Sequence, residues 1–180
     1  MSQSINWSEN RRAGHLGTLG GTKSWAYGIN DSGQVVGYSF TPNPYVFGDY
    51  VIHAYLTGAN GVGMTDLGTL GGTNSFAYGI NASGQVVGSS NMTHDLNIHA
   101  FLYDGGAMMD LNYLLTAGLD GDAFLYSATA INDSGQIVAH SSDARSYLLT
   151  PIAASVPEPA TAWLMVSALV GLGAARRRRV

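Results

Sequence analysis

The sequence contains no cysteine and little charge. Its 180 residues include no Cys, and only 11% are Asp, Glu, Lys or Arg. The absence of Cys excludes a disulfide framework, a Cys-ligated zinc site and a Cys nucleophile. Low charge together with 24 Gly and ten Tyr is typical of turn-rich β structure, because helical bundles use more Ala, Leu, Glu and Lys. The chain is 46% hydrophobic, which is enough apolar material for a folded core.

Basic residues are scarce outside the C-terminus. Four of the eight Lys and Arg residues are Arg176, Arg177, Arg178 and Arg179, which leaves four basic against twelve acidic residues, a net charge of −8. A nucleic-acid backbone requires a basic patch, so we expect no nucleic-acid partner. Residues 1–15 also lack the apolar stretch of a secretory signal, which makes any surface destination conditional on a signal upstream of Met1.

The chain repeats itself every 51 residues. Leu16–Thr22 recurs without change as Leu67–Thr73, and a third, weaker copy surrounds residues 130–138. A period near 50 residues is typical of a repeat array or a propeller. Within the first copy, four short runs have the alternation of β-strands, and they cover residues 24–29, 34–37, 53–56 and 64–67.

The sequence therefore predicts an all-β fold over residues 1–150. We expect antiparallel four-stranded repeat units that form an incomplete β-propeller-like array, followed by one C-terminal hydrophobic helix. Two to three units are fewer than the four to eight blades of most propellers, so exposed edge strands and a longer parent protein are expected. The loops before the third strand vary most between copies, and the longest, residues 38–52, contains Tyr45, Phe47 and Tyr50.

Two sets of residues recur at structural positions of the repeat. The first is the turn sequence Asn-x-Ser-Gly, in which Asn bonds its own backbone and Gly accepts positive φ. The second is a His that precedes Ala and an aromatic residue. These positions are Asn30, Gly33, Asn81, Gly84, Asn132, Gly135, His53 and His99.

The sequence changes character after Thr150. Residues 151–159 form a linker that contains Val156, Pro157, Glu158 and Pro159, and Pro cannot continue a helix there. Residues 160–175 carry no charge and precede the Arg cluster. As a helix they would span about 24 Å at about 1.5 Å per residue, slightly less than a hydrocarbon core of about 30 Å. We predict a transmembrane sorting helix over residues 160–180 with the Arg cluster on the cytoplasmic side. The alternative is an amphipathic or core helix with a solvated basic end.

This tail resembles the PEP-CTERM sorting signal of Gram-negative bacteria. The resemblance covers residues 156–180 and implies three roles: Val156–Pro159 as the recognition motif, residues 160–175 as a transient anchor in the lipid bilayer, and Arg176–Arg179 as the stop signal. It implies an exosortase as the processing partner and a route from the inner membrane to the cell surface.

The body resembles the HAF extracellular repeat. The resemblance rests on the strings Leu-Gly-Thr-Leu-Gly-Gly, Gly-Ile-Asn-x-Ser-Gly-Gln-Val-Val-Gly and His-Ala-Phe-Leu, and it covers residues 14–150. It implies an extracellular repeat protein, and the family association suggests extracellular polysaccharide as a partner. The small number of repeats departs from the family pattern.

The recurring His residues are weak candidates for metal ligands. His53 and His99 occupy equivalent positions, but the third copy has Arg145 there, and the sequence shows no fixed carboxylate partner for either imidazole. The turns could be imagined as calcium loops, but the second copy has Ala82 where the others have Asp. We expect structural roles, no metal and no cofactor.

The recurring carboxylates Asp66 and Asp110 raise the possibility of acid–base chemistry on a sugar. Repeat-equivalent residues are usually structural, so we predict no catalytic residues and no enzyme activity. The leading hypothesis is a non-enzymatic binding or structural module of the extracellular matrix. The alternatives are a glycan-active enzyme fragment, in which two carboxylates would share one pocket, and a truncated, non-functional gene product.

Overall fold

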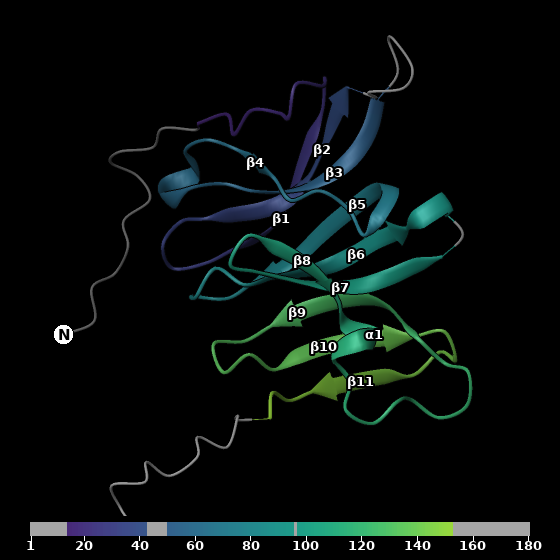
Figure 1. The fold of residues 1–180 in the computed structure, drawn as a ribbon. Coiled ribbons are helices and arrows are strands. Elements are labelled where there is room, and N and C mark those ends of the chain that lie inside the picture. The colour runs from purple at the N-terminus through teal and green to yellow at the C-terminus, as the bar shows by residue number, and fades with distance from the viewer. Residues whose placement is uncertain (1–13, 43–49, 96, 153–180) are drawn as a thin grey trace, which may run out of the picture. The chain divides into compact units, whose positions relative to one another are not determined.

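The computed structural model describes residues 14–42, 50–95 and 97–152, and these residues form three antiparallel β-sheets that lie one above another (Figure 1). The first sheet contains β1 (Ser24–Ile29), β2 (Val35–Pro42), β3 (Tyr50–Leu56) and β4 (Thr65–Asp66). The second contains β5 (Gly71–Ile80), β6 (Val86–Met92), β7 (Ile98–Asp104) and β8 (Ala107–Asp110). The third contains β9 (Leu125–Ile131), β10 (Ile137–Ser141) and β11 (Ser146–Leu149), in the order β11-β10-β9.

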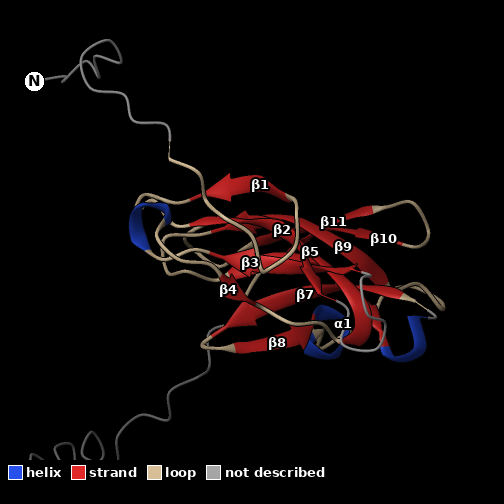
Figure 2. Ribbon diagram, turned by 90° about the horizontal axis from the view of Figure 1, so that it is seen from above, coloured by secondary structure: helices blue, strands red, loops and turns tan. Residues whose placement is uncertain are grey.

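The helical segments are single turns. They are η1 (Ala59–Gly61), η2 (Thr93–Asp95) and α1 (Leu111–Leu114), and Figure 2 shows them at the margins of the strands. None of the helices among the described residues is long and apolar enough to cross a membrane. The hydrophobic helix predicted at residues 160–175 lies outside the described residues.

The predicted all-β, antiparallel fold is confirmed. The prediction of four strands is correct for the first two units and wrong for the third, whose sheet has three strands. After β11 the chain continues with Thr150 and Pro151, and Pro has no N–H to donate to a fourth strand. The propeller-like arrangement stays a prediction.

The variable loop of the first unit is shorter than predicted. β2 runs on to Pro42 and β3 begins at Tyr50, so both strands extend into the expected loop of residues 38–52. The extension follows from the alternation of Tyr38 and Phe40 with smaller polar residues, which continues the period of the strand. Tyr45 and Phe47 lie outside the described residues.

Each repeat turns from its first to its second strand in the same way. The Asn30 Oδ1 accepts hydrogen bonds from the backbone N–H groups of Ser32 at 3.1 Å and Gln34 at 3.0 Å. Gly33 closes the turn at φ 71°, a value that disfavours any residue with a Cβ. The equivalent glycines also have positive φ: Gly84 at 81° and Gly135 at 73°.

The sheets pack face to face around two apolar cores. In each core the earlier of the two repeat units contributes a Val, an Ala and a Leu at repeat-equivalent positions. The first core contains Val36, Ala54, Leu67, Ala77, Ile80, Val86 and Phe101. The second core contains Val87, Ala100, Leu111, Leu125, Ala128, Ile137 and Ala139.

Glycine and asparagine fix the spacing between sheets. A Cβ on Gly28 would lie 3.2 Å from the Tyr78 carbonyl oxygen, and one on Gly79 would lie 3.2 Å from the Ala130 Cα. Asn side chains then bond the stacked turns together, because the Nδ2 of Asn30 donates to the Asn81 carbonyl at 3.0 Å. The same bond recurs from the Asn81 Nδ2 to the Asn132 carbonyl at 3.2 Å. Neighbouring units are therefore joined by a repeated interface.

Candidate functional site

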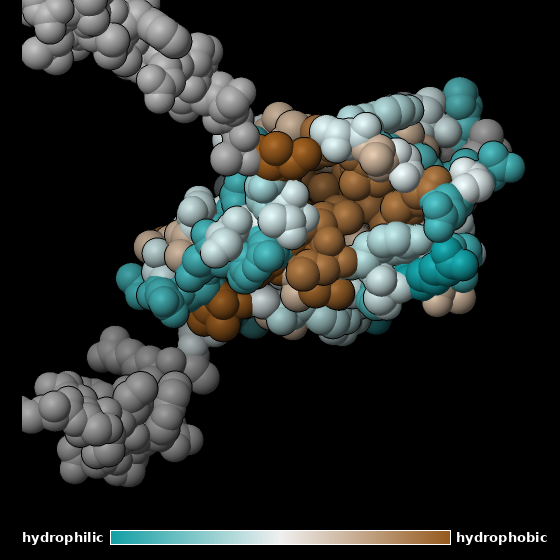
Figure 3. Space-filling view, turned by 90° about the horizontal axis from the view of Figure 1, so that it is seen from below, coloured by the Kyte–Doolittle hydropathy of each residue, from teal (hydrophilic) through white to brown (hydrophobic). Residues whose placement is uncertain are grey.

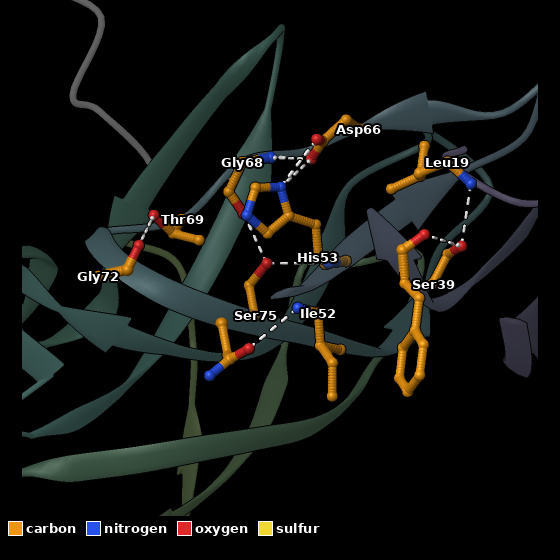
Figure 4. A network of polar contacts seen from close by, with 12 residues as sticks. Leu19, Ser39, Ile52, His53, Asp66, Gly68, Thr69, Gly72 and Ser75 are labelled. Carbon is orange, nitrogen blue, oxygen red and sulfur yellow. Dashed lines mark hydrogen bonds and ion pairs between the residues drawn. The ribbon is translucent and has the colours of Figure 1, made fainter. Parts of the chain in front are cut away.

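Each of the first two sheets carries a His–Asp pair at one edge, between its third and fourth strands. The Nδ1 of His53 on β3 lies 2.8 Å from an Asp66 oxygen on β4 (Figure 4). The Nδ1 of His99 on β7 lies 2.6 Å from an Asp110 oxygen on β8. The expectation that these imidazoles have no carboxylate partner is therefore wrong.

The pairing follows from strand register. Asp66 is the direct cross-strand partner of Tyr55, and Asp110 that of Phe101. Each Asp is therefore a diagonal neighbour of the His two residues before its partner, on the same face of the sheet. His and Asp are 13 residues apart in sequence in the first pair and 11 residues apart in the second, so no single sequence spacing would have predicted both pairs.

The carboxylates also hold the backbone that follows them. Asp66 Oδ1 accepts the Gly68 N–H at 2.8 Å. Asp110 Oδ1 accepts the Asn112 N–H at 2.9 Å and so caps α1. Asn112 in turn bonds both backbone groups of Leu125 at 2.7 and 2.9 Å, which ties the second sheet to the third.

A serine beside the first pair has a structural role. Ser75 is fully buried, its Oγ accepts the Ala54 N–H at 2.8 Å, and the same Oγ donates to the Gly68 carbonyl at 2.6 Å. Figure 4 shows these bonds surrounding His53. Because the Ser75 hydroxyl donates its proton to a backbone carbonyl and has no access to solvent, this Ser, His and Asp do not form a nucleophilic triad.

The third unit replaces the pair with a different ion network. Arg145, at the position of His53 and His99, lies 3.4 Å from oxygens of both Asp143 and Asp120. Within the described ranges, no group of three His, Cys, Asp or Glu side chains could hold a metal ion. Asp66 and Asp110 each bond their own His and do not form a pair with each other.

The first His–Asp pair predicts a pH dependence of stability. Burial raises the pKa of Asp66. The hydrogen bonds from His53 and the Gly68 N–H, together with the imidazole charge, lower this pKa by more than burial raises it, so the Asp66 pKa lies below its ordinary value. A depressed carboxyl pKa contributes stability above the unfolded pKa, and this is lost as pH falls through the folded pKa. We expect Asp66→Asn to cost about 1 kcal/mol at pH 7, since the site is partly exposed, and less at pH 3.

Urea unfolding at the two pH values measures this difference. Asp120→Asn is the matched control, because the Asp120 side chain is 92% exposed and its ion pair should contribute little. An Asp66→Asn loss that is equal at both pH values would contradict the assignment.

A second feature is an aromatic strip on the surface of the first two sheets. Trp25 on β1 and Tyr38 on β2 are cross-strand partners, and their ring centroids are 5.0 Å apart. Further ring contacts of 5.0 to 6.0 Å extend the strip along β1, β2, β3 and β5. Its members are Trp25, Tyr27, Tyr38, Phe40, Tyr50, Phe76 and Tyr78.

The strip is accessible and uncharged. Trp25 is 40% exposed, Tyr27 54% and Tyr50 41%. The Tyr27 hydroxyl donates to the Tyr38 hydroxyl at 3.3 Å, and this bond together with burial raises the pKa of Tyr38 to about 12, so its phenol stays neutral. The Nζ of Lys23 lies 5.9 Å from the centroid of the Phe40 ring, at the margin of the strip.

Sequence reasoning missed this strip, although one signal was present. Tyr38 and Phe40 of the first unit correspond to Ser89 and Asn91 of the second, so aromatic residues gather where the repeat loses its symmetry. Residues that only maintain the repeat should recur in every copy. The strip is therefore the candidate functional surface of the described residues.

Comparison with protein families places the repeats and the tail separately. Residues 18–147 match the model described as "Protein of unknown function (DUF3466)". The chain belongs to the DUF3466 family. Residues 155–179 match the PEP-CTERM protein-sorting motif, which confirms the sorting signal predicted from Val156–Pro159 and the Arg cluster. No curated protein and no solved structure matches the chain.

The PEP-CTERM motif indicates that this DUF3466 protein is exported and processed by an exosortase. The residues of the motif, the basic cluster and the expected anchor lie outside the described residues. The HAF-repeat resemblance stays a prediction.

Proposed function

We propose that the DUF3466 domain is a non-enzymatic binding module of the extracellular matrix, and that its aromatic strip binds polysaccharide. The strip carries the proposal. Flat, amphipathic rings pack against the apolar faces of sugar rings, and neighbouring hydroxyls supply hydrogen bonds. A low-charge surface with fixed rings suits a neutral polymer, because ordering two-χ aromatic side chains costs little entropy.

The sorting tail supports this choice of ligand. A protein delivered to the outside of a cell meets extracellular polymers, and residues 160–175 would anchor it in the bilayer until the exosortase cuts it. The surface localisation and the polysaccharide are part of the proposal.

A glycan-cleaving enzyme is the rival function. Such an enzyme needs two carboxyl groups on either side of one glycosidic bond. Asp66 and Asp110 instead bond separate His residues and separate backbone N–H groups. This arrangement favours a structural role for both carboxylates and a binding function for the domain.

Affinity electrophoresis through gels that contain hydroxyethyl cellulose, xylan or dextran tests the proposal. We expect at least one polysaccharide to retard the protein, and the double variant Trp25→Ala/Tyr27→Ala to weaken this binding at least about tenfold, or roughly 1.4 kcal/mol. The matched control is Tyr113→Ala, because Tyr113 is 81% exposed and outside the strip.

Two results would contradict the proposal: no retardation by any of the polymers, or equal binding by the strip and control variants. Release of reducing ends from a retarding polymer would instead support the enzyme.

A further inference from the structure

The two ends of the stack of sheets expose some of the positions that are buried between sheets. Ile29 on the outer side of the first sheet is 69% exposed, whereas the equivalent Ile80 is 9% exposed in the first core. On the outer side of the third sheet, Val138 is 38% exposed, whereas Val36 and Val87 are fully buried. Figure 3, which views the stack from the side of the third sheet, shows apolar side chains gathered in the middle of this surface.

We call these two surfaces the first end and the third end. The first end consists of Ala26, Ile29, Asn30 and Asp31. The third end consists of Ala130, Asn132, Asp133, Val138 and Leu148. Each residue of one end has repeat equivalents that contact the next sheet inside the stack.

The hydrogen-bonding groups of the two ends are complementary. Inside the stack, an Asn Nδ2 donates to the Asn carbonyl of the following unit, and the Ala82 N–H donates to the Asp133 carboxylate at 2.9 Å. At the third end, the Asn132 Nδ2 bonds only Gln136 of its own turn among the described residues. At the first end, the Asp31 carboxylate has no partner in the described part of the chain.

We propose that a second copy of this chain covers these ends, with the third end of one copy against the first end of the next. The contact repeats the interface that already joins the units within one chain. Asn132 Nδ2 then donates to the Asn30 carbonyl, the Asp133 N–H donates to the Asp31 carboxylate, and Val138 and Leu148 pack against Ala26 and Ile29. This head-to-tail contact is heterologous, so it builds a ring if the rotation closes and a filament if it does not.

The end residues favour this occupant over a face-to-face dimer of like ends. Two first ends together would bring the Asp31 carboxylates near each other without an N–H donor between them. Two third ends would place two Asn132 Nδ2 donors together. Neither donor would meet the Asn carbonyl that accepts from the equivalent Asn81 Nδ2 inside the stack. Only the contact between unlike ends supplies a partner for each group.

Ala130 sets the strength of the contact. Its equivalents Gly28 and Gly79 lack a Cβ, and a Cβ on Gly79 would lie 3.2 Å from the Cα of the next sheet. The Ala130 methyl group would meet Gly28 of the next copy at this tight distance, so the copies must move apart by a few tenths of an ångström. Ala130→Gly should therefore tighten the association.

Disulfide trapping tests the contact in the full chain, which contains no native Cys. Positions 31, 82 and 133 are repeat equivalents on successive turns. We mix the Asp31→Cys and Asp133→Cys variants in detergent, oxidise them and measure covalent dimers on gels. The double variant Asp31→Cys/Ala82→Cys is the internal control for the geometry, because the same two positions already stack within one chain.

We expect the mixture to form at least about tenfold more disulfide dimer than either variant alone. Ile29→Glu in the Asp31→Cys partner should reduce the dimer to the level of an Asp120→Cys control, because the Asp120 side chain is 92% exposed and belongs to neither end. Ala130→Gly in the Asp133→Cys partner should increase it.

The proposal is overturned if the internal control links and the mixture does not. It is also overturned if Asp31→Cys links to itself as readily as to Asp133→Cys, which would indicate a face-to-face dimer or association through the tail.

Discussion

Replacing Asn81 with Ala is expected to destabilise the DUF3466 domain by about 3 kcal/mol, because three hydrogen bonds are lost at a buried site. Asn81 is 3% exposed. Its Oδ1 accepts the Gln85 N–H at 3.0 Å, and its Nδ2 donates to the Gln85 side chain at 2.7 Å and to the Asn132 carbonyl at 3.2 Å. Ala leaves the Gln85 N–H without its side-chain acceptor, and the Asn132 carbonyl keeps only the bond from the Gly135 N–H at 2.9 Å.

Asn132→Ala is the matched control. Asn132 makes the same bonds within its own turn, to Gln136, but it is exposed, and among the described residues its Nδ2 has no bond to a further turn. We expect a cost of about 1 kcal/mol, which is typical of an exposed turn residue. Urea unfolding followed by Trp fluorescence compares the two variants. Equal costs would show that the bond between stacked turns adds no stability.

The local part of this fold was predictable because it depends on neighbours in sequence. Alternation predicts β1 with its observed bounds, Ser24–Ile29, and the turn chemistry of Asn30 and Gly33 predicts the hairpin that follows. These interactions span four residues or fewer, so the identities of the residues are sufficient. The same reasoning failed for the third unit, where it carried a strand over from its neighbours without support from the residues after Leu149.

The His–Asp pairs depended on information that the sequence does not state. Which carboxylate meets His53 depends on the register of β3 against β4, and the intervening loop differs in length between the two units. A shift of one residue would move Asp66 to the other face of the sheet. Only the observed pairing shows that His53 and Asp66 meet.

The aromatic strip was missed for a related reason. Tyr27 lies in a β-bulge, where the register shifts between Ala26 and Gly28, and the bulge directs its ring toward Tyr38 and Tyr78. Simple alternation does not place a bulged residue. The break in repeat symmetry at Tyr38 and Phe40 was visible in the sequence and would have indicated the surface.

Replacing Gly88 with Ala is expected to destabilise the domain by about 3 kcal/mol or more, because the new methyl group overlaps backbone atoms. A Cβ at Gly88 on β6 would lie 1.9 Å from the Phe76 carbonyl oxygen and 2.8 Å from the Phe101 ring. The ring could shift, but the carbonyl belongs to β5, the strand paired with β6, so the sheet itself must distort. The third unit has Ala139 at this position, and the register of its sheet shifts between Val138 and Ala139 and again between His140 and Ser141.

Gly118→Ala is the control for this substitution, because Gly118 lacks a positive φ and its Cβ would meet no atom within 4 Å. It should change stability by less than about 0.5 kcal/mol. Thermal unfolding followed by circular dichroism should place the melting temperature of Gly88→Ala at least about 6 °C below that of the control, at about 2–4 °C per kcal/mol for a chain of this size. A melting temperature equal to the control would contradict the close approach of the β5 backbone to Gly88 on β6.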